Sequence, residues 1–384
     1  MKKMKFYIFI LFLSIFTSGI LTAQITPEFE IGAKGVVSGN LNINSEESNA
    51  VSDFSDTQLL LGLKQKLYNS WRSDFVVGFQ FPDANSNLGQ VYFNNVFIKV
   101  EDQKNIFKIG RSTALTILNE FPTLRDDDAM KFIYTLNPFS NGDNTERDQY
   151  ANVLEYTRIV KQRILVSLHG ENFYNNSSPD DFKLNSMGFA LQYKIPESQK
   201  WNRNFLQDIG ISFNNYFTNN NSIESSLKYL IFSTTLNLKP DPVNFIDFKF
   251  QSIYNFGLDE VTNIADYSDY TRSKSTSLFG MIRYIKQKYE RLDYQISVGA
   301  GYRTFTDTDT DQLIFVGNAF YRLGENFDIG VQYRYIKNNG IAKTLFGESE
   351  NRVQLAFVYS FDKIFNKQFD DRNSILNLEH KYIK

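Results

Sequence analysis

The sequence predicts an all-β fold, a transmembrane antiparallel β-barrel of about 16 strands, and three observations support this. Apolar and polar residues alternate with a period of two almost throughout positions 24–361. Short turns alternate along the chain with longer loops rich in Asn, Ser and Asp. Aromatic residues make up 16% of the chain, yet its mean hydropathy is −0.35. A barrel whose strands alternate lipid-facing and water-facing side chains produces all three features.

The alternation is clearest in residues 292–302, 327–335 and 353–361. In 327–335 the apolar positions are Phe327, Ile329, Val331, Tyr333 and Tyr335, and the residues between them are Asp328, Gly330, Gln332 and Arg334. A strand places such a set on one face, whereas a helix does not. These runs approach the length of about 9–11 residues that a tilted spanning strand needs.

The connections between these runs also alternate in length. Short ones lie at 69–70, 102–103, 161–162, 239–242 and 324–326, with slightly longer ones at 197–203 and 286–291. Long ones lie at 40–54, 83–89, 175–181, 218–224, 258–270, 307–311 and 338–350. Short periplasmic turns and long extracellular loops are typical of membrane barrels, and an even strand count places both termini in the periplasm. A large soluble β-sandwich or solenoid is the alternative.

The N-terminal segment predicts export. Lys2, Lys3 and Lys5 precede the apolar residues 6–20, and Ala23 offers a small residue at a cleavage point. We therefore expect a signal peptide at 1–23 and a barrel at 24–361, with an N-terminal membrane anchor as the alternative. The net charge of −2 becomes about −5 without those three lysines, which is not typical of nucleic-acid-binding proteins. The chain has no cysteine, so disulfides and Cys-ligated metals are excluded.

One connection, residues 112–149, is far longer than the others. Long loops in compact domains are usually functional or disordered, and its many Leu, Phe, Ile and Met residues argue against disorder. We expect it to fold into the barrel lumen. Its charged residues form a candidate pore constriction: Glu120, Arg125, Asp126, Asp127, Asp128 and Lys131. The alternative for Asp126–Asp128 is that they cap a short helix or solvate a turn.

Several motifs around this connection resemble the Gram-negative general porin family. Residues 106–111 read Ile-Phe-Lys-Ile-Gly-Arg and precede the long loop, and Arg147 and Asn152–Tyr156 follow it. Residues 118–121 are similar to a Leu-Pro-Glu-Phe motif of that family, and residues 61–64 to its Leu-Gly-Phe-Lys. The order of strands and loops matches along essentially the whole mature chain. The resemblance implies a 16-stranded homotrimeric diffusion pore with the third loop as its constriction.

The chain departs from that family at three places. Leu60 stands where the resemblance implies a pore arginine, and Thr157-Arg158-Ile159-Val160 replaces the motif expected after Tyr156. The family ends on an aromatic residue, here Phe361, whereas this chain continues to Lys384. Residues 362–384 are therefore expected to be a periplasmic tail, an extra strand or a plug. A porin of narrower selectivity is an open alternative.

The expected function is passive diffusion of small hydrophilic solutes or ions through a water-filled pore in the outer membrane. Strand parity and the resemblance give the candidate pore lining: Lys64, Lys66, Arg72, Lys108, Arg111, Arg147, Asp293, Arg303 and Arg334. Parity also places Asp74, Asp247, Lys249, Asp328 and Arg352 inside. The expected partners are membrane lipid, lipopolysaccharide and solutes, with no nucleic acid and no cofactor. A non-conducting receptor, adhesin or secretion component is the alternative.

An enzymatic function is not expected. Ser167 and His169 share one strand face, as the Ser and His of outer-membrane phospholipases do, but parity points them inward, away from lipid. With two histidines in the chain, a His-ligated zinc site is not expected either. Residues 307–311 (Asp-Thr-Asp-Thr-Asp) read first as a polar extracellular loop and second as a weak Ca²⁺ site.

Overall fold

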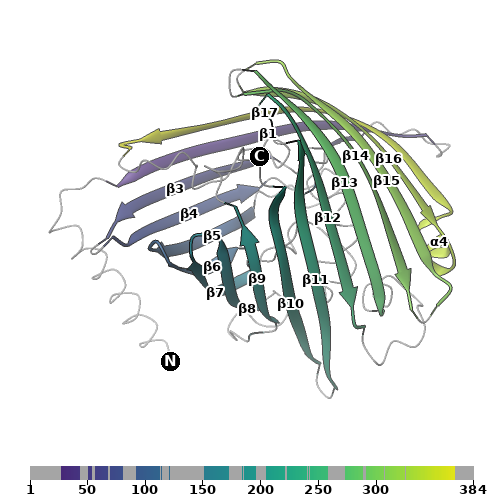
Figure 1. Cartoon of the computed structure of the whole chain (residues 1–384), viewed down its shortest axis with the longest axis horizontal. Helices are drawn as coiled ribbons and strands as arrows, with labels where there is room; N and C mark the ends of the chain where they lie inside the picture. Colours follow the sequence, from purple (N-terminus) through teal and green to yellow (C-terminus); the bar gives the residue numbers. More distant parts are fainter. Residues whose placement is uncertain are drawn as a thin grey trace.

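The fold is a closed antiparallel β-barrel, described here from a computed structural model (Figure 1). The structure describes residues 27–43, 51–53, 57–67, 70–80, 92–112, 114, 121, 151–172, 184, 186–195, 205–220, 223–239, 241, 243–257, 273–288, 291–306, 308–324 and 326–367. The expected signal peptide lies outside these residues. Within them, no helix is both long and apolar enough to cross a membrane.

Sixteen long strands and one short strand, β2, form the wall. In chain order the strands are β1 (Glu28–Asn42), β2 (Val51–Asp53), β3 (Gln58–Lys66), β4 (Arg72–Gln80), β5 (Tyr92–Glu101), β6 (Asn105–Ser112), β7 (Ala151–Val160), β8 (Ile164–Asn172), β9 (Ser186–Lys194), β10 (Leu206–Asn220), β11 (Ile223–Lys239), β12 (Asn244–Asn255), β13 (Ser275–Lys288), β14 (Arg291–Phe305), β15 (Asp311–Arg322), β16 (Phe327–Asn338) and β17 (Ser349–Phe365). The predicted count of about 16 strands is confirmed.

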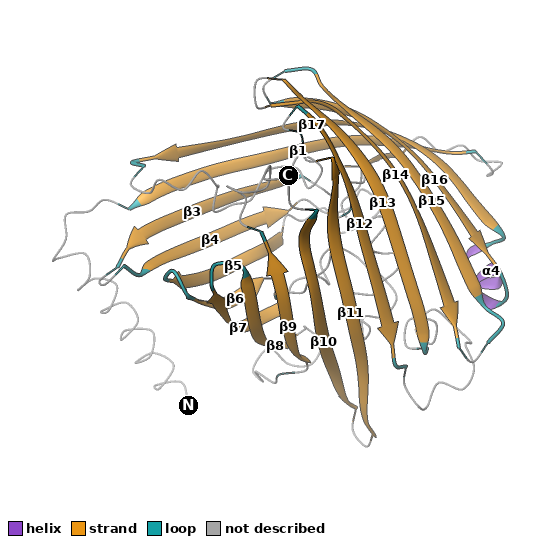
Figure 2. Cartoon of the chain, viewed as in Figure 1, coloured by secondary structure: helices purple, strands orange, loops and turns teal. Residues whose placement is uncertain are grey.

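The long strands pair in chain order, with β3 pairing directly with β1, and the barrel closes where β1 pairs with β17. Strand β2 pairs with the later part of β1, beyond the residues of β1 that pair with β3. Strands are the dominant element of the described chain, and a single helix, α4 (Ile341–Phe346), lies in the β16–β17 connection (Figure 2). Closure leaves no free sheet edge, which is the condition for a sheet to span lipid.

The wall is uneven in height. Strands β3 to β9 have 8–10 residues each, whereas β10 to β17 have 12–17, and β10 to β16 form the side on the right of Figure 1. At a rise of about 3.4 Å per residue and a tilt of about 40°, the strands of 12–17 residues exceed an apolar belt about 25 Å tall, whereas those of 8–10 residues span about 21–26 Å and only just match it.

The last strand continues past the predicted end of the barrel. Phe361 was expected to be the terminal aromatic residue, but β17 runs four residues further to Phe365. Phe365 pairs with Phe29 of β1, and their rings stack with centroids 5.8 Å apart. The boundary at 361 is therefore wrong. The strand continues because β1 offers it a partner as far as Phe29, and residues 368–384 lie outside the described part.

Short turns join the strands at one end of the barrel. At the β5–β6 turn, Asp102 Oδ1 accepts hydrogen bonds from the backbone N–H groups of Lys104 (2.7 Å) and Asn105 (2.6 Å). The bond from Lys104 lowers the pKa of the Asp102 carboxyl below its ordinary value of 3.8. At the β7–β8 turn, Lys161 and Gln162 both adopt a positive φ, as the two central residues of a tight hairpin turn do.

The outer surface is apolar. Along β14 the outward residues Ile296, Val298 and Tyr302 are exposed, whereas the alternate residues Gln295 and Ser297 are buried inside. The same alternation on the other strands gives a continuous apolar belt, typical of a lipid-facing surface.

Val298 lies at the middle of β14 and is the most exposed large apolar residue of the described chain. We expect Val298→Arg to lower the free energy of unfolding by about 2–4 kcal/mol, the cost of an arginine at mid-bilayer. Chemical unfolding of the refolded barrel in lipid vesicles measures this, with Val298→Leu as the control. Equal stability of the two variants would contradict a lipid-facing position.

Candidate functional site

The inner face of the barrel is the candidate functional site, because polar and charged side chains gather there. The strands other than β2 contribute inward residues at alternate positions. Buried polar examples are Ser38, Gln80, Ser112, Thr157, Ser212, Thr235, Gln251, Gln295, Asn318, Gln332 and Gln354. Such a surface suits water and dissolved solutes rather than a dry core.

Most of the predicted pore-lining residues share this inner face. On the face that the buried inward residues define lie Lys64, Lys66, Arg72, Lys108, Asp293, Arg303 and Arg334. Asp74, Asp247, Lys249, Asp328 and Arg352 lie on it as well. Period-two alternation was sufficient to place them, since one face of each strand is consistently apolar.

Arg111 is a correction. Register pairs it with Val96 and Asn152, which lie on the outer side of β5 and β7, and its Nε donates to the backbone oxygen of Phe93. Lys108 points inward, so the residue three positions later points outward. The family resemblance had suggested the lumen. Arg147 and the constriction set Glu120, Arg125, Asp126, Asp127, Asp128 and Lys131 lie outside the described residues.

Carboxylates pair with many of the inward cations. Asp247 lies directly opposite Arg283, whose Nε donates to Asp247 Oδ1 at 3.0 Å while a terminal nitrogen bonds the other oxygen. The same two-point contact joins Arg322 to Asp328, at 2.7 and 2.9 Å. Planar guanidinium and carboxylate groups match in this geometry, which fixes both side chains.

Further ion pairs lie along the inner wall. Arg72 pairs with Glu101, and Arg334 with Glu350. Sequence reasoning missed Arg283, Glu101 and Glu350. Arg283 lies among Phe279, Met281 and Ile285 on the inner face, so both faces of β13 are apolar and alternation gave no signal there.

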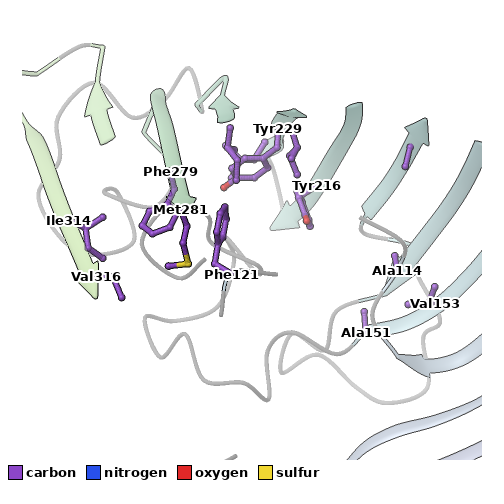
Figure 3. Close-up of a cluster of buried hydrophobic side chains, with 14 residues drawn as sticks. Ala114, Phe121, Ala151, Val153, Tyr216, Tyr229, Phe279, Met281, Ile314 and Val316 are labelled. Atoms are coloured by element: carbon purple, nitrogen blue, oxygen red, sulfur yellow. The ribbon is translucent and has the colours of Figure 1, made fainter. Parts of the chain in front are cut away.

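A cluster of apolar side chains interrupts the polar lumen on the side of β10 to β15 (Figure 3). Its members on these strands are Tyr216, Leu227, Tyr229, Ile231, Ile253, Phe279, Met281, Ile314 and Val316. Phe279 lies at its centre, fully buried, across Gly301 of the neighbouring strand. A Cβ at Gly301 would lie 2.6 Å from the Phe279 ring, so a side chain there would displace the ring.

Phe121, from the long β6–β7 connection, belongs to this cluster. Its ring meets the Phe279 ring edge-on with centroids 4.6 Å apart, and only 2% of the residue is exposed (Figure 3). Such aromatic pairs contribute about 0.5–1.5 kcal/mol beyond the area they bury. This contact lies inside the barrel, so Phe121 reaches the inner wall at β13.

Ala114, also from this connection, is anchored on another part of the wall. Its backbone N–H donates to the carboxylate of Glu171 on β8, which also accepts a hydrogen bond from Ser186 at 2.8 Å. In the sheet order, β13 lies five strands around the barrel from β8, where eight strands would be diametrically opposite. The two described residues of the connection therefore contact well-separated parts of the inner wall.

Leu60 also faces inward. It packs against Val76, with Phe97 beside them, as a small apolar cluster on β3 to β5. The position where the resemblance implies a pore arginine is therefore occupied by apolar surface.

Ser167 and His169 lie on the inner face of β8, as parity predicts. Ser167 is fully buried and accepts a hydrogen bond from the Thr157 hydroxyl at 3.0 Å. The side chains of His169 and Asn214 both lie against Gly188. A Cβ at position 188 would overlap both of them. Within the described residues, no three His, Asp or Glu side chains gather closely enough to hold a metal ion.

Among comparisons with known proteins, only the comparison of structures finds similar proteins. No family model and no curated protein matches the sequence. Among solved structures, the chain is similar to the outer membrane channel DcaP of Acinetobacter baumannii, with 11% identity over 88% of this chain and 99% of that one and a TM-score of 0.62.

Two further porins are comparably similar. An anion-selective porin from Comamonas acidovorans is 10% identical over 87% of this chain and 98% of that one, with a TM-score of 0.58. OprB of Pseudomonas putida is 11% identical over 87% of this chain and 94% of that one, with a TM-score of 0.59. The chain thus has the fold of the outer-membrane porins.

The Asp247–Arg283 pair allows a test of the inner wall. Asp247→Asn leaves the fully buried Arg283 guanidinium without its compensating charge, so we expect a loss of about 3–5 kcal/mol in the free energy of unfolding. Chemical unfolding in vesicles is the measurement. The control is Glu348→Gln, which removes an acid from the exposed Lys343–Glu348 pair and should leave the unfolding midpoint unchanged. Equal midpoints for the two variants would contradict the buried contact.

Proposed function

We propose that this chain is an outer-membrane porin that lets small hydrophilic solutes or ions diffuse through its lumen. The observation that carries the proposal is the polar, charged inner face of a closed 16-strand barrel whose outer face is apolar. Barrels of 16–18 strands are wide enough for an aqueous channel. The similar structures are described as porins and channels, which supports the same role here.

The β6–β7 connection, residues 112–149, is proposed to form the constriction. Support comes from Ala114 and Phe121, which contact separate parts of the inner wall. A segment held at both points would narrow the channel between them. The solutes that pass would then be selected by the width left beside this segment and by the charges facing it.

The charged residues of this connection are proposed to face the wall cations. Glu120, Asp126, Asp127 and Asp128 would set a transverse field against inward residues such as Arg303 and Arg334, with Arg125, Lys131 and Arg147 contributing positive charge. This part of the proposal rests on sequence composition and on the inward position of the wall arginines.

Location and assembly follow from the same proposal. Residues 1–23 would be the signal peptide of an integral outer-membrane protein, and 368–384 a periplasmic tail. The apolar belt would contact membrane lipid, and the extracellular rim of the barrel would contact lipopolysaccharide. A homotrimer is proposed because a similar Vibrio cholerae outer membrane protein, OmpT, is described in a trimer form.

Planar-bilayer recording of the purified protein tests the function. We expect single-channel steps in KCl, and Phe121→Ala should raise their conductance because the contact with Phe279 is lost. Phe121→Leu, which keeps an apolar side chain, serves as the control. Absence of conductance at every voltage would reject the porin function and favour a receptor, adhesin or secretion component.

A further inference from the structure

A row of charged side chains crosses the inner wall from β1 to β7. Direct cross-strand neighbours in register are Glu28 and Lys64, Lys64 and Asp74, Asp74 and Lys99, Lys99 and Lys108, and Lys108 and Glu155. We name these six residues the charge ladder: Glu28, Lys64, Asp74, Lys99, Lys108 and Glu155. Three are acidic and three are basic, so the charge ladder is formally neutral.

Ion pairs connect the members of the charge ladder. Lys99 Nζ lies 2.8 Å from Asp74, and Lys108 Nζ lies 2.9 Å from Glu155. Lys64 Nζ lies 3.9 Å from Glu28. Lys99 and Lys108 are like charges side by side, and each is flanked on its other side by an acid, which offsets their repulsion.

The two central lysines are the members that face the channel most openly. The side chains of Lys99 and Lys108 are 25% and 15% exposed, whereas those of Asp74 and Glu155 are 0% and 5% exposed. A passing solute therefore meets the ammonium groups first, with the carboxylates directly behind them. The acids reduce the field of the lysines at short range, because opposite charges a few ångströms apart act as a dipole.

The charge ladder also climbs along the channel. Glu28 begins β1 at the turn end of the barrel, whereas Glu155 lies at the middle of β7. Six strands about 4.8 Å apart, tilted by about 40°, give a rise of about 15 Å between these two residues. A solute crossing the membrane would therefore follow the charge ladder over a large part of its path.

We propose that the charge ladder is a selectivity element that keeps the pore nearly neutral toward small ions and favours zwitterionic solutes. Its net charge of zero, together with the neutral Arg72–Glu101 pair beside Lys99, gives this part of the wall little long-range preference for cations or anions. A solute with an ammonium and a carboxylate group can turn its carboxylate toward the exposed ammonium groups of Lys99 and Lys108, while the acids behind them offset the repulsion of its own ammonium group. This inference rests on the porin function proposed above.

Reversal potentials in a KCl gradient test the element. We expect Glu155→Gln to raise the chloride-to-potassium permeability ratio about sevenfold, because one unit charge about 7 Å away in water changes the permeability of each ion about 2.7-fold, in opposite directions for the two ions. Lys108→Gln should lower the ratio by a similar factor, and the double variant should return it to the wild-type value. Glu348→Gln removes an acid outside the lumen and should leave the ratio unchanged.

The results separate this inference from the porin function. If the wild-type protein forms no conducting channels, the proposed porin function itself is rejected. A conducting protein whose single variants keep the wild-type ratio rejects the charge ladder as a selectivity element. The expected opposite shifts, restored in the double variant, support it; shifts of one sign in both variants would reject it.

Liposome swelling tests the solute class. Wild-type pores should admit the zwitterion 4-aminobutyrate at least as fast as the uncharged, similarly sized erythritol. Lys108→Gln and Glu155→Gln should each slow 4-aminobutyrate relative to erythritol. The first removes an ammonium group that attracts the solute's carboxylate, and the second removes the acid that offsets the repulsion between Lys108 and the solute's ammonium group. A wild-type pore that admits erythritol but is several-fold slower for 4-aminobutyrate would overturn the zwitterion preference.

Discussion

The pairing of β1 with β17 is the interaction on which the rest of the molecule depends. Fourteen residue pairs, from Phe29 with Phe365 to Asn42 with Arg352, join the first strand to the last. Lipid offers no hydrogen bonds to backbone groups, so an open sheet edge in a membrane would be left unsatisfied at several kcal/mol per group. Closure removes that cost, and it also separates an inside from an outside.

Because inside and outside are separate, alternate residues of each strand can form an apolar outer surface and a polar inner one. Outward positions such as Val298 and Leu355 need only be apolar, whereas inward positions hold the ion pairs and polar groups of the lumen. The inner face is itself divided. The wall from β1 to β7 carries the charge ladder, and the wall from β10 to β15 carries the apolar cluster that receives Phe121. The proposed constriction depends on this division, because the apolar side provides an anchor and the charged side is left to meet solutes.

Period-two alternation was enough to predict the barrel, its strand number and the inward position of residues such as Lys64 and Arg303. It could not predict which inward residues are neighbours, because the face of a residue follows from its own strand whereas its neighbours follow from register between strands. The charge ladder is visible only in the register. Alternation also failed on β13, where Phe279 and Met281 face inward and Leu278 and Ile282 outward, so both faces are apolar. Arg111 shows the limit of family resemblance, since its strand position alone decides its face.

Thiol modification tests the central claim, that the inner face lines a continuous aqueous channel, most directly. The chain has no cysteine, so single cysteines can be introduced without background. Gln192 and Leu191 are adjacent on β9, the first inward and the second exposed on the outer surface. A hydrophilic, membrane-impermeant thiosulfonate should modify Gln192→Cys in the reconstituted barrel and reduce its conductance, while Leu191→Cys in lipid stays unmodified. Equal modification of both, or modification of Gln192→Cys without any change in conductance, would contradict the account.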